Sequence, residues 1–347
     1  MKTKLLIGLA ILQVLVLATM AAQREWVLRK GRTIYLRTAP VDPRDAMRGD
    51  YVRLNYQISR VPRQFWRGRL ASTNETPEPL PRDTKVYAAL RVSEEGMGEL
   101  VSLSTEQPAQ EIFVRGRTDE FVGGGLQVRY GLEAYFMEQG KGRELEQERN
   151  RDGIQVPLEM AVAVGSSGLA VLKEHRWCAL GIGLDLESAT NATSRDGAIQ
   201  QRRVVAARVR LLNADTNDLA IVDQPGGRSL ALVADSQWTE NPWRWAREKE
   251  TLAAPETSEV IVLKPGQTHS MRINFDDPQW SVVREDKGRS EKPVPTRLVD
   301  LNQDWSARFR LEYRPPERAV CKSLPNARLI WHGRLPSRAF NAVGGVD

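Results

Sequence analysis

The sequence predicts a mainly β protein that carries one membrane helix at its N-terminus. Three observations predict it: an apolar run over residues 5–22, apolar and polar residues that alternate with a period of two along much of the remaining chain, and turns rich in Gly and Pro between those stretches. The length of 347 residues predicts about two domains. We therefore expect a membrane helix over 1–24, a mostly β domain with short helices over 25–175, and a β-sandwich of immunoglobulin-like kind over 176–347.

The apolar run at the N-terminus is the first element. Leu5 to Ala22 spans 18 residues without a charge, and Lys2 and Lys4 precede it. This length is short for a spanning helix and long for the core of a signal peptide. Trp26 lies where a membrane helix would reach the interface, whereas Thr19-Met20-Ala21 is a poor cleavage site. A retained signal anchor is therefore favoured over a cleaved signal peptide.

The orientation of that helix is not settled by charge, because basic residues flank both of its ends. Lys2 and Lys4 compete with four residues that follow the run: Arg24, Arg29, Lys30 and Arg32. A single N-terminal apolar segment normally exports the chain that follows it. We therefore expect a cytoplasmic N-terminus and an extracytoplasmic body, on the periplasmic side of the inner membrane.

The composition narrows the class of partner. Hydrophobic residues make up 41% of the chain, and 50 basic against 44 acidic residues leave a net charge of +6. The charges are mixed along the chain without a basic stripe of interleaved aromatic residues, which argues against a nucleic acid as partner. A mildly basic surface favours anionic lipid nearby, but it also describes an ordinary solvated surface.

Residue types that bind metals or carry redox chemistry are sparse. The three histidines stand far apart, and Cys178 and Cys321 form no Cys-x-x-Cys pair. No zinc or redox motif is visible, and we expect no metal and no cofactor. The two cysteines either pair in an extracytoplasmic domain or remain separate buried thiols.

Residues 40–58 hold the most informative stretch. Asp42 can cap a short helical turn that starts at Pro43, and Gly49 can end that turn. From Tyr51 to Ile58 apolar and polar residues alternate, which predicts a half-buried strand. By parity, Leu54 and Tyr56 should enter the core while Tyr51 faces the other side.

This stretch resembles the signature of the GDYXXLXY family, through Gly49-Asp50-Tyr51, Leu54 and Tyr56. The block from Val128 to Phe136, and Gly140 to Glu146 after it, also resemble that family. The resemblance covers roughly residues 1–173. It implies a bacterial protein with an N-terminal hydrophobic anchor and no established activity, and genes that often lie beside those of polytopic membrane proteins.

Further strands are predicted from the same alternation. In the first domain a strand region with a Lys30-Gly31 turn covers 27–36, and the proline-rich segment 61–82 reads as a long loop. The other strands of this domain are 85–92, 100–103, 112–117 and 126–136, with a charged helix over 140–149 and a hairpin of 156–164 and 169–172 around Gly165-Ser166-Ser167-Gly168. In the second domain they are 178–186, 204–212, 229–233, 260–263, 270–275, 308–313 and 328–335.

Charged residues crowd the signature, and they define the candidate binding site. One interpretation is a polar site that also uses the second family block; the other is a salt-bridged turn that fixes the strand, which we favour because exposed charge clusters are individually weak. The candidate residues are Asp42, Arg44, Asp45, Arg48, Gly49, Asp50, Tyr51, Arg53, Arg129 and Glu133.

No catalytic motif supports an enzyme. Membrane-anchored signal peptidases also carry a Gly-Asp before an apolar strand, but this chain has Ala46-Met47 where they need a nucleophilic serine. Gly165-Ser166-Ser167-Gly168 lacks the Gly-x-Ser-x-Gly elbow. We therefore expect a non-enzymatic, membrane-anchored cell-envelope protein whose extracytoplasmic β-domains bind a partner, a polytopic membrane protein. The alternative is an anchored hydrolase or carbohydrate-binding protein, for which Trp238, Trp243 and Trp245 could form a platform unless they pack internally.

Overall fold

The computed structural model describes residues 2–39, 51–71, 80–109, 111–122, 125–136, 150–191, 201–236, 241–248, 250, 252–285, 294–301, 304 and 306–342. The fold is mainly β with antiparallel sheets and one long N-terminal helix, which confirms the predicted class. The chain divides into two compact units, the first of 1–121, 126–139 and 159–176, and the second of 122–125, 140–158 and 177–347. Independent folding of domains 25–175 and 176–347 stays a prediction.

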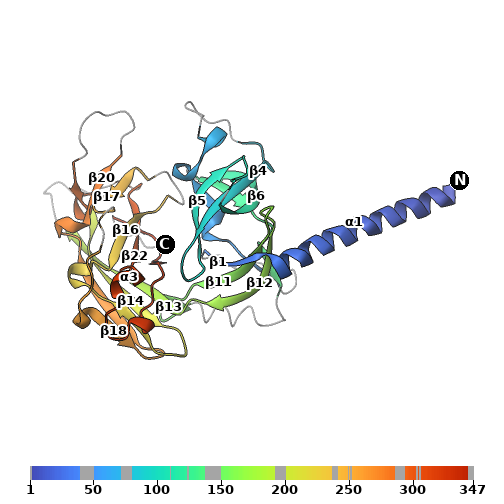
Figure 1. Ribbon diagram of the computed structural model, residues 1–347. Coiled ribbons are helices and arrows are strands. Elements are labelled where there is room, and N and C mark those ends of the chain that lie inside the picture. The colour runs from blue at the N-terminus through green and yellow to red at the C-terminus, as the bar shows by residue number, and fades with distance from the viewer. Residues whose placement is uncertain are drawn as a thin grey trace. The chain divides into compact units, whose positions relative to one another are not determined.

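Helix α1 covers Lys2–Lys30, so it extends six residues past the predicted end of the membrane helix, and the first strand begins only at Arg32. Its last turns are held by an ion pair of 2.6 Å between Glu25 and Arg29 and by the burial of Val27. Only Gly31 separates α1 from β1, Arg32–Arg37 (Figure 1). A Cβ on Gly31 would come within 2.4 Å of the Val27 carbonyl oxygen, so the tight join requires glycine.

Among the described residues, the first unit contains three sheets. Strand β1 pairs antiparallel with β11, Leu158–Val164, which forms the predicted hairpin with β12, Ala170–Trp177. A two-stranded sheet joins β2, Tyr51–Arg53, to β8, Ala134–Phe136. The strands of the five-stranded sheet, in spatial order, are β3, Arg60–Pro62; β7, Gly125–Arg129; β6, Ile112–Val122; β4, Lys85–Val92; and β5, Gly98–Ser104.

The predicted strand over 51–58 is wrong beyond Arg53. Tyr56 makes only an isolated bridge to Thr38, and a 3₁₀ turn, η1, follows over Gln57–Ser59. The side-chain hydroxyl of Ser59 accepts a hydrogen bond of 3.2 Å from the Tyr56 backbone N–H, so local bonding replaces a sheet ladder. Leu54, Tyr56 and Ile58 are nevertheless buried, as predicted.

The predicted strand over 126–136 is also interrupted, because β7 ends at Arg129 and β8 begins at Ala134. Gly131 has φ +75°, a conformation that breaks the extended run. Inside the break, the Glu133 carboxylate accepts a hydrogen bond of 2.5 Å from the Tyr130 backbone N–H. Leu126, Val128, Tyr130 and Leu132 are buried as expected, whereas Ala134 is exposed.

In the described part of the predicted loop after residue 60, the first unit also contains the 3₁₀ turns η2, Arg63–Phe65, and η3, Gly68–Leu70. Trp66 follows η2 and is buried, and its indole N–H donates to the Val61 carbonyl at 3.1 Å. The predicted helix over 140–149 lies outside the described residues.

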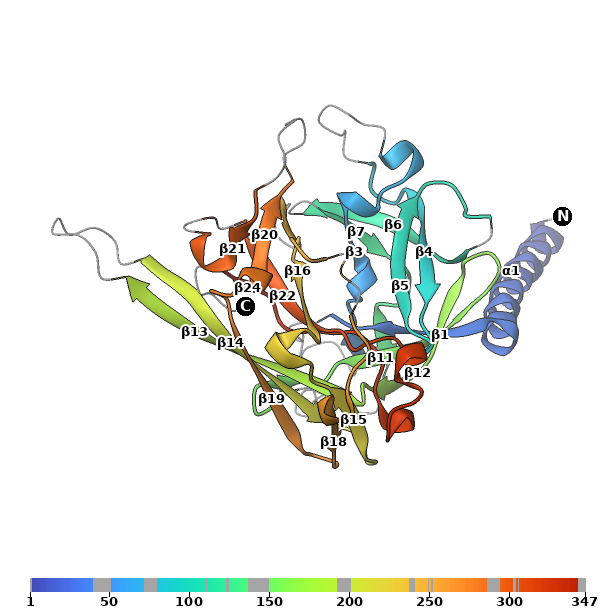
Figure 2. The same cartoon turned by 60° about the vertical axis from the view of Figure 1, so that its left-hand side comes forward.

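The second unit is built around a long hairpin of β13, Leu180–Asn191, and β14, Gln201–Asn213 (Figure 2). Its five-stranded sheet adds β19, Thr268–Asn274, on one side, and β10, Ile154–Gln155, and β9, Asn150–Arg151, on the other. A second sheet contains β16, Leu230–Ala234; β22, Arg308–Tyr313; β23, Leu335–Pro336; and β24, Phe340–Asn341. Smaller sheets pair β15, Leu219–Val222, with β18, Val260–Leu263, and β20, Ser281–Arg284, with β17, Trp243–Trp245, and β21, Thr296–Arg297.

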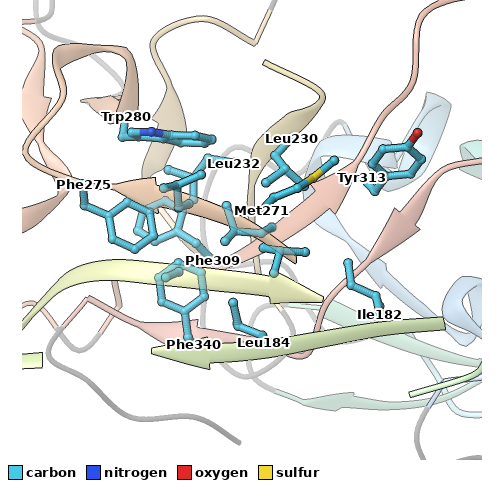
Figure 3. Close-up of a cluster of buried hydrophobic side chains, with 14 of the residues drawn as sticks. Ile182, Leu184, Leu230, Leu232, Met271, Phe275, Trp280, Phe309, Tyr313 and Phe340 are labelled. Carbon is cyan, nitrogen blue, oxygen red and sulfur yellow. The ribbon is translucent and has the colours of Figure 1, made fainter. Parts of the chain in front are cut away.

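One hydrophobic core joins the main sheets of this unit, as a sandwich requires. The cluster includes Ile182 and Leu184 of β13, Phe309 of β22, and Phe275, Trp280 and Phe340 (Figure 3). The rings of Phe275 and Phe340 stack with centroids 5.8 Å apart. Such aromatic contacts add to area burial.

Two features of the second unit bear on the sequence analysis: the state of the cysteines, which it left open, and the strand predicted over 328–335. The thiols of Cys178 and Cys321 are both buried, in separate clusters, and they form no disulfide. The predicted strand over 328–335 is wrong, because a 3₁₀ turn, η8, covers Ala327–Leu329 and β23 begins only at Leu335. A left-handed Asn326, with φ +62°, precedes η8 and turns the chain there. The short helix α3 covers Arg318–Cys321.

Candidate functional site

Most of the predicted site falls outside the described part of the chain. Tyr51 and Arg53 lie on β2, where their backbones pair with Phe136 and Ala134, and their side chains are not described. Arg129 and Glu133 are described in full. The residues outside the described ranges are Asp42, Arg44, Asp45, Arg48, Gly49 and Asp50. The site therefore stays a prediction, and the structure shows the frame that holds it.

The two chain segments that flank residues 40–53 lie side by side. The Ala39 N–H donates to the Asn55 carbonyl at 2.7 Å, and Thr38 bridges Tyr56. The Leu54 N–H donates to the Glu133 carbonyl, also at 2.7 Å. Backbone hydrogen bonds therefore tie the first family block to β1 and to the second family block.

Two tyrosines lock the family blocks together through reciprocal hydrogen bonds. The Tyr56 hydroxyl donates to the Leu132 carbonyl at 2.8 Å, and the Tyr130 hydroxyl donates to the Ile58 carbonyl at 2.8 Å. Both side chains are buried. Burial, and secondarily the Glu133 carboxylate, raises the pKa of both phenols well above the usual range. We call Tyr56 and Tyr130 the tyrosine clamp; it makes the last tyrosine of the signature a packing residue.

Replacing Tyr56 or Tyr130 by phenylalanine should lower the free energy of unfolding by about 1–3 kcal/mol, because each change leaves a buried carbonyl without its donor. The double variant should also lose stability less steeply as the pH rises above 10. Above that pH an unfolded tyrosine releases its proton while the folded clamp retains it, so rising pH favours unfolding of the native chain. Urea unfolding at neutral and alkaline pH checks both points, and parallel pH curves would contradict the second.

Arg129 and Glu133 serve local structure. Arg129 is exposed and forms an ion pair with Asp83 at 2.6 Å and with Asp119 at 3.5 Å. Glu133 closes its own turn by accepting from the Tyr130 N–H. Among the described residues, these two therefore have separate partners, which fits the interpretation of these charges as structural.

A buried ion triad lies on the β1–β11–β12 sheet, and the sequence analysis did not single it out. Arg37 and Glu159 are register partners whose side chains are only 7% and 4% exposed, with 2.8 Å between Arg37 Nη2 and Glu159 Oε1. Arg176 Nε lies 2.9 Å from the other carboxylate oxygen of Glu159. The Arg176 guanidinium also lies 3.5 Å from the ring centroid of Tyr35. Glu159 on β11 therefore links β1 and β12, and its carboxylate supplies the negative charge that both arginines contact.

A half-buried tyrosine–histidine pair adjoins the triad, because His175 directly precedes Arg176 on β12. The Tyr135 hydroxyl and His175 Nδ1 are 2.9 Å apart, and the rings meet edge to face. Tyr135 is the register partner of Val52, so this pair connects the signature strand to β12. Within the described ranges, no group of three or more His, Cys, Asp or Glu side chains could hold a metal ion.

The second unit contains an open polar cleft of about 510 Å³. Arg247 forms an ion pair with Glu250 and also donates to Gln279 at 3.1 Å. The hydrogen bond that Glu250 accepts from Arg247 holds the pKa of Glu250 below its usual range. Gln224 donates to Glu259 at 3.3 Å. The cleft is lined by Gln224, Pro225, Gly226, Arg228, Arg247, Glu259, Asp277 and Gln279.

The tryptophans considered as a platform are used mostly for packing. Trp243 is buried and its indole N–H donates to Asp304 at 2.7 Å. Burial alone would raise the pKa of Asp304, but hydrogen bonds from Ser306 and Trp243 outweigh it and lower that pKa. Trp245 stacks on the buried Trp280, and Trp238 lies outside the described residues.

These features define a mainly β protein with one N-terminal apolar helix, an arrangement that suggests membrane anchoring. The helix is long and apolar enough over Lys4–Lys30 to cross a bilayer: its most apolar 18-residue window has a mean hydropathy of 2.5 and is not buried by the rest of the chain.

The family model described as GDYXXLXY protein matches residues 13–174, which confirms the resemblance inferred from the signature and the segment assigned to it. The chain matches no curated protein and no solved structure.

Proposed function

We propose that this chain is a non-enzymatic, membrane-anchored protein of the cell envelope whose extracytoplasmic β-domains bind a polytopic membrane protein. The observation that carries the proposal is α1, a helix exposed along its apolar run and joined through Gly31 alone to the segment that matches the family model. A partner embedded in the same bilayer would meet this segment at a high effective concentration.

The proposed binding surface is the signature segment itself, with Tyr51 and Arg53 on β2. The tyrosine clamp and the hydrogen bond between Ala39 and Asn55 hold the described residues that flank this segment, and these residues form its base. A fixed base favours binding because less conformational freedom is lost when the partner docks.

The anchor and the orientation are tested together by cell fractionation and protease accessibility. We expect the full chain in the membrane fraction, and degradation of its body when spheroplasts are treated with protease. Recovery of a soluble form that starts near Ala22 would contradict the anchor. Protection of the body in intact spheroplasts, with cleavage after lysis, would contradict the periplasmic orientation.

The alternative, an anchored carbohydrate-binding protein or hydrolase, has one feature in its favour, the polar cleft of the second unit. Amide and charged side chains of this kind bind hydroxyl groups. However, Arg247 already binds Glu250 and Gln279, and Gln224 binds Glu259. We therefore place partner binding first.

A further inference from the structure

The end of α1 and the β11–β12 turn lie against each other in the first unit. Val27 is buried, and a Cβ on Gly165 at the start of that turn would come within 2.9 Å of Val27 Cγ2. The turn is closed by hydrogen bonds of 2.9 Å from Gly165 N–H to the Leu169 carbonyl and from Gly168 N–H to the Gly165 carbonyl. Ser166 and Ser167 at its tip are exposed.

The height of this turn above the bilayer follows from helix geometry. Val27 is the fifth residue after Ala22, the last of the apolar run, which corresponds to a rise of about 7.5 Å. The polar headgroup layer on each side of the hydrocarbon is about 5–7.5 Å thick. With the apolar run of α1 spanning the hydrocarbon, as proposed above, Val27 and the turn against it would lie at the level of the lipid headgroups.

Two further features keep the turn at that level. The apolar run of 18 residues is about 27 Å long, slightly shorter than the hydrocarbon core of about 30 Å, so hydrophobic mismatch draws the end of the helix inwards. The single residue between α1 and β1 leaves little room for a hinge, because Gly31 is packed against backbone atoms of Val27 and Val164.

The exposed side chains around this junction carry positive charge. Arg24, Arg29, Lys30 and Arg32 are exposed, and Glu25 is the one acidic residue between 24 and 32, which leaves four positive charges against one negative. Trp26 is 68% exposed on the same helical turns, where aromatic residues favour the bilayer interface. Basic residues next to a membrane helix are attracted by anionic lipid.

We propose that these residues form a membrane-resting surface that contacts anionic lipid headgroups, so that the first unit sits on the bilayer and is not loosely tethered to it. The membrane-resting surface consists of Arg24, Arg29, Lys30, Arg32, Ser166 and Ser167. The inference rests on the proposed anchoring of α1 and deepens it. It also places the signature segment at a fixed orientation relative to a partner in the same bilayer.

The test uses the full chain in phosphatidylcholine vesicles that contain phosphatidylglycerol. A nitroxide is attached to Ser166→Cys, and its collision rate with nickel chelated on lipid headgroups is compared with that of a variant that has a flexible Gly/Ser linker of about six residues between Lys30 and Gly31. The native cysteines are buried, and the unsubstituted chain measures any labelling of them.

We expect the collision rate to fall several-fold in the linker variant. It should also fall when Lys30→Glu and Arg32→Glu are combined, and in vesicles of phosphatidylcholine alone. Equal rates with and without the linker, in chains that still float with the vesicles, would overturn the resting surface and leave the anchor intact. Equal rates in vesicles with and without phosphatidylglycerol would overturn the assignment to anionic lipid. Failure of the native chain to float with the vesicles would overturn the anchor itself.

Discussion

Replacing Glu159 by alanine is expected to lower the free energy of unfolding of the first unit by about 3–5 kcal/mol, because it removes one partner of a buried ion pair. Arg37 is only 7% exposed, and Glu159 Oε1 lies 2.8 Å from it. The same change removes the carboxylate that holds Arg176 on β12 at 2.9 Å. Urea unfolding of the full chain in mild detergent measures the effect.

Glu174 provides the matched control, since it is an exposed glutamate of β12 in the same hairpin. Glu174→Ala should change the free energy of unfolding by no more than about 0.5 kcal/mol. A similar small effect for Glu159→Ala would show that the triad does not stabilise the sheet.

Leu54→Ala should lower the free energy of unfolding by about 2–5 kcal/mol, through lost burial and the cavity that remains. Leu54 is 4% exposed, and its N–H donates to the Glu133 carbonyl, so the surrounding backbone cannot easily collapse into the space. Val101 on β5 is the matched aliphatic control, because it is 38% exposed. Val101→Ala should cost little; an equally small cost for Leu54→Ala would contradict the packing role of the signature.

Regular strands were predicted well from the sequence because their pattern is local. The strands 85–92, 260–263 and 308–313 agree with β4, β18 and β22 to the residue, and the hairpin around Gly165-Ser166-Ser167-Gly168 is confirmed. In each of these elements the alternation of side chains and the turn residues indicate the same strand pairing.

The strand predicted over 51–58 was wrong because contacts with residues far away in the sequence shape this segment. Tyr56 and Tyr130 find their partners across 76 and 72 residues, and neither carbonyl can be identified from spacing. Burial was predicted from parity, but alternation does not reveal that η1 follows Tyr56 or that Gly131 interrupts the second block. β15 was missed because four consecutive buried residues carry no period.

The sequence contains one indication of the buried ion triad that the sequence analysis did not use. Glu159 is the only charged residue of β11, a strand whose seven residues are all buried. A carboxylate in such a strand needs a buried cation, and Arg37 lies opposite it in the register. The pairing itself depends on the sheet order β1–β11–β12, which the sequence does not reveal.

The most direct test of partner binding places a photo-reactive phenylalanine derivative at Tyr51 in native membranes, with the same group at Val101 as the control. The account predicts an adduct between position 51 and a polytopic membrane protein, none at position 101, and a melting temperature nearly unchanged by Tyr51→Ala. Absence of that adduct, or a large loss of stability in Tyr51→Ala, would contradict the account and make the whole signature a packing motif.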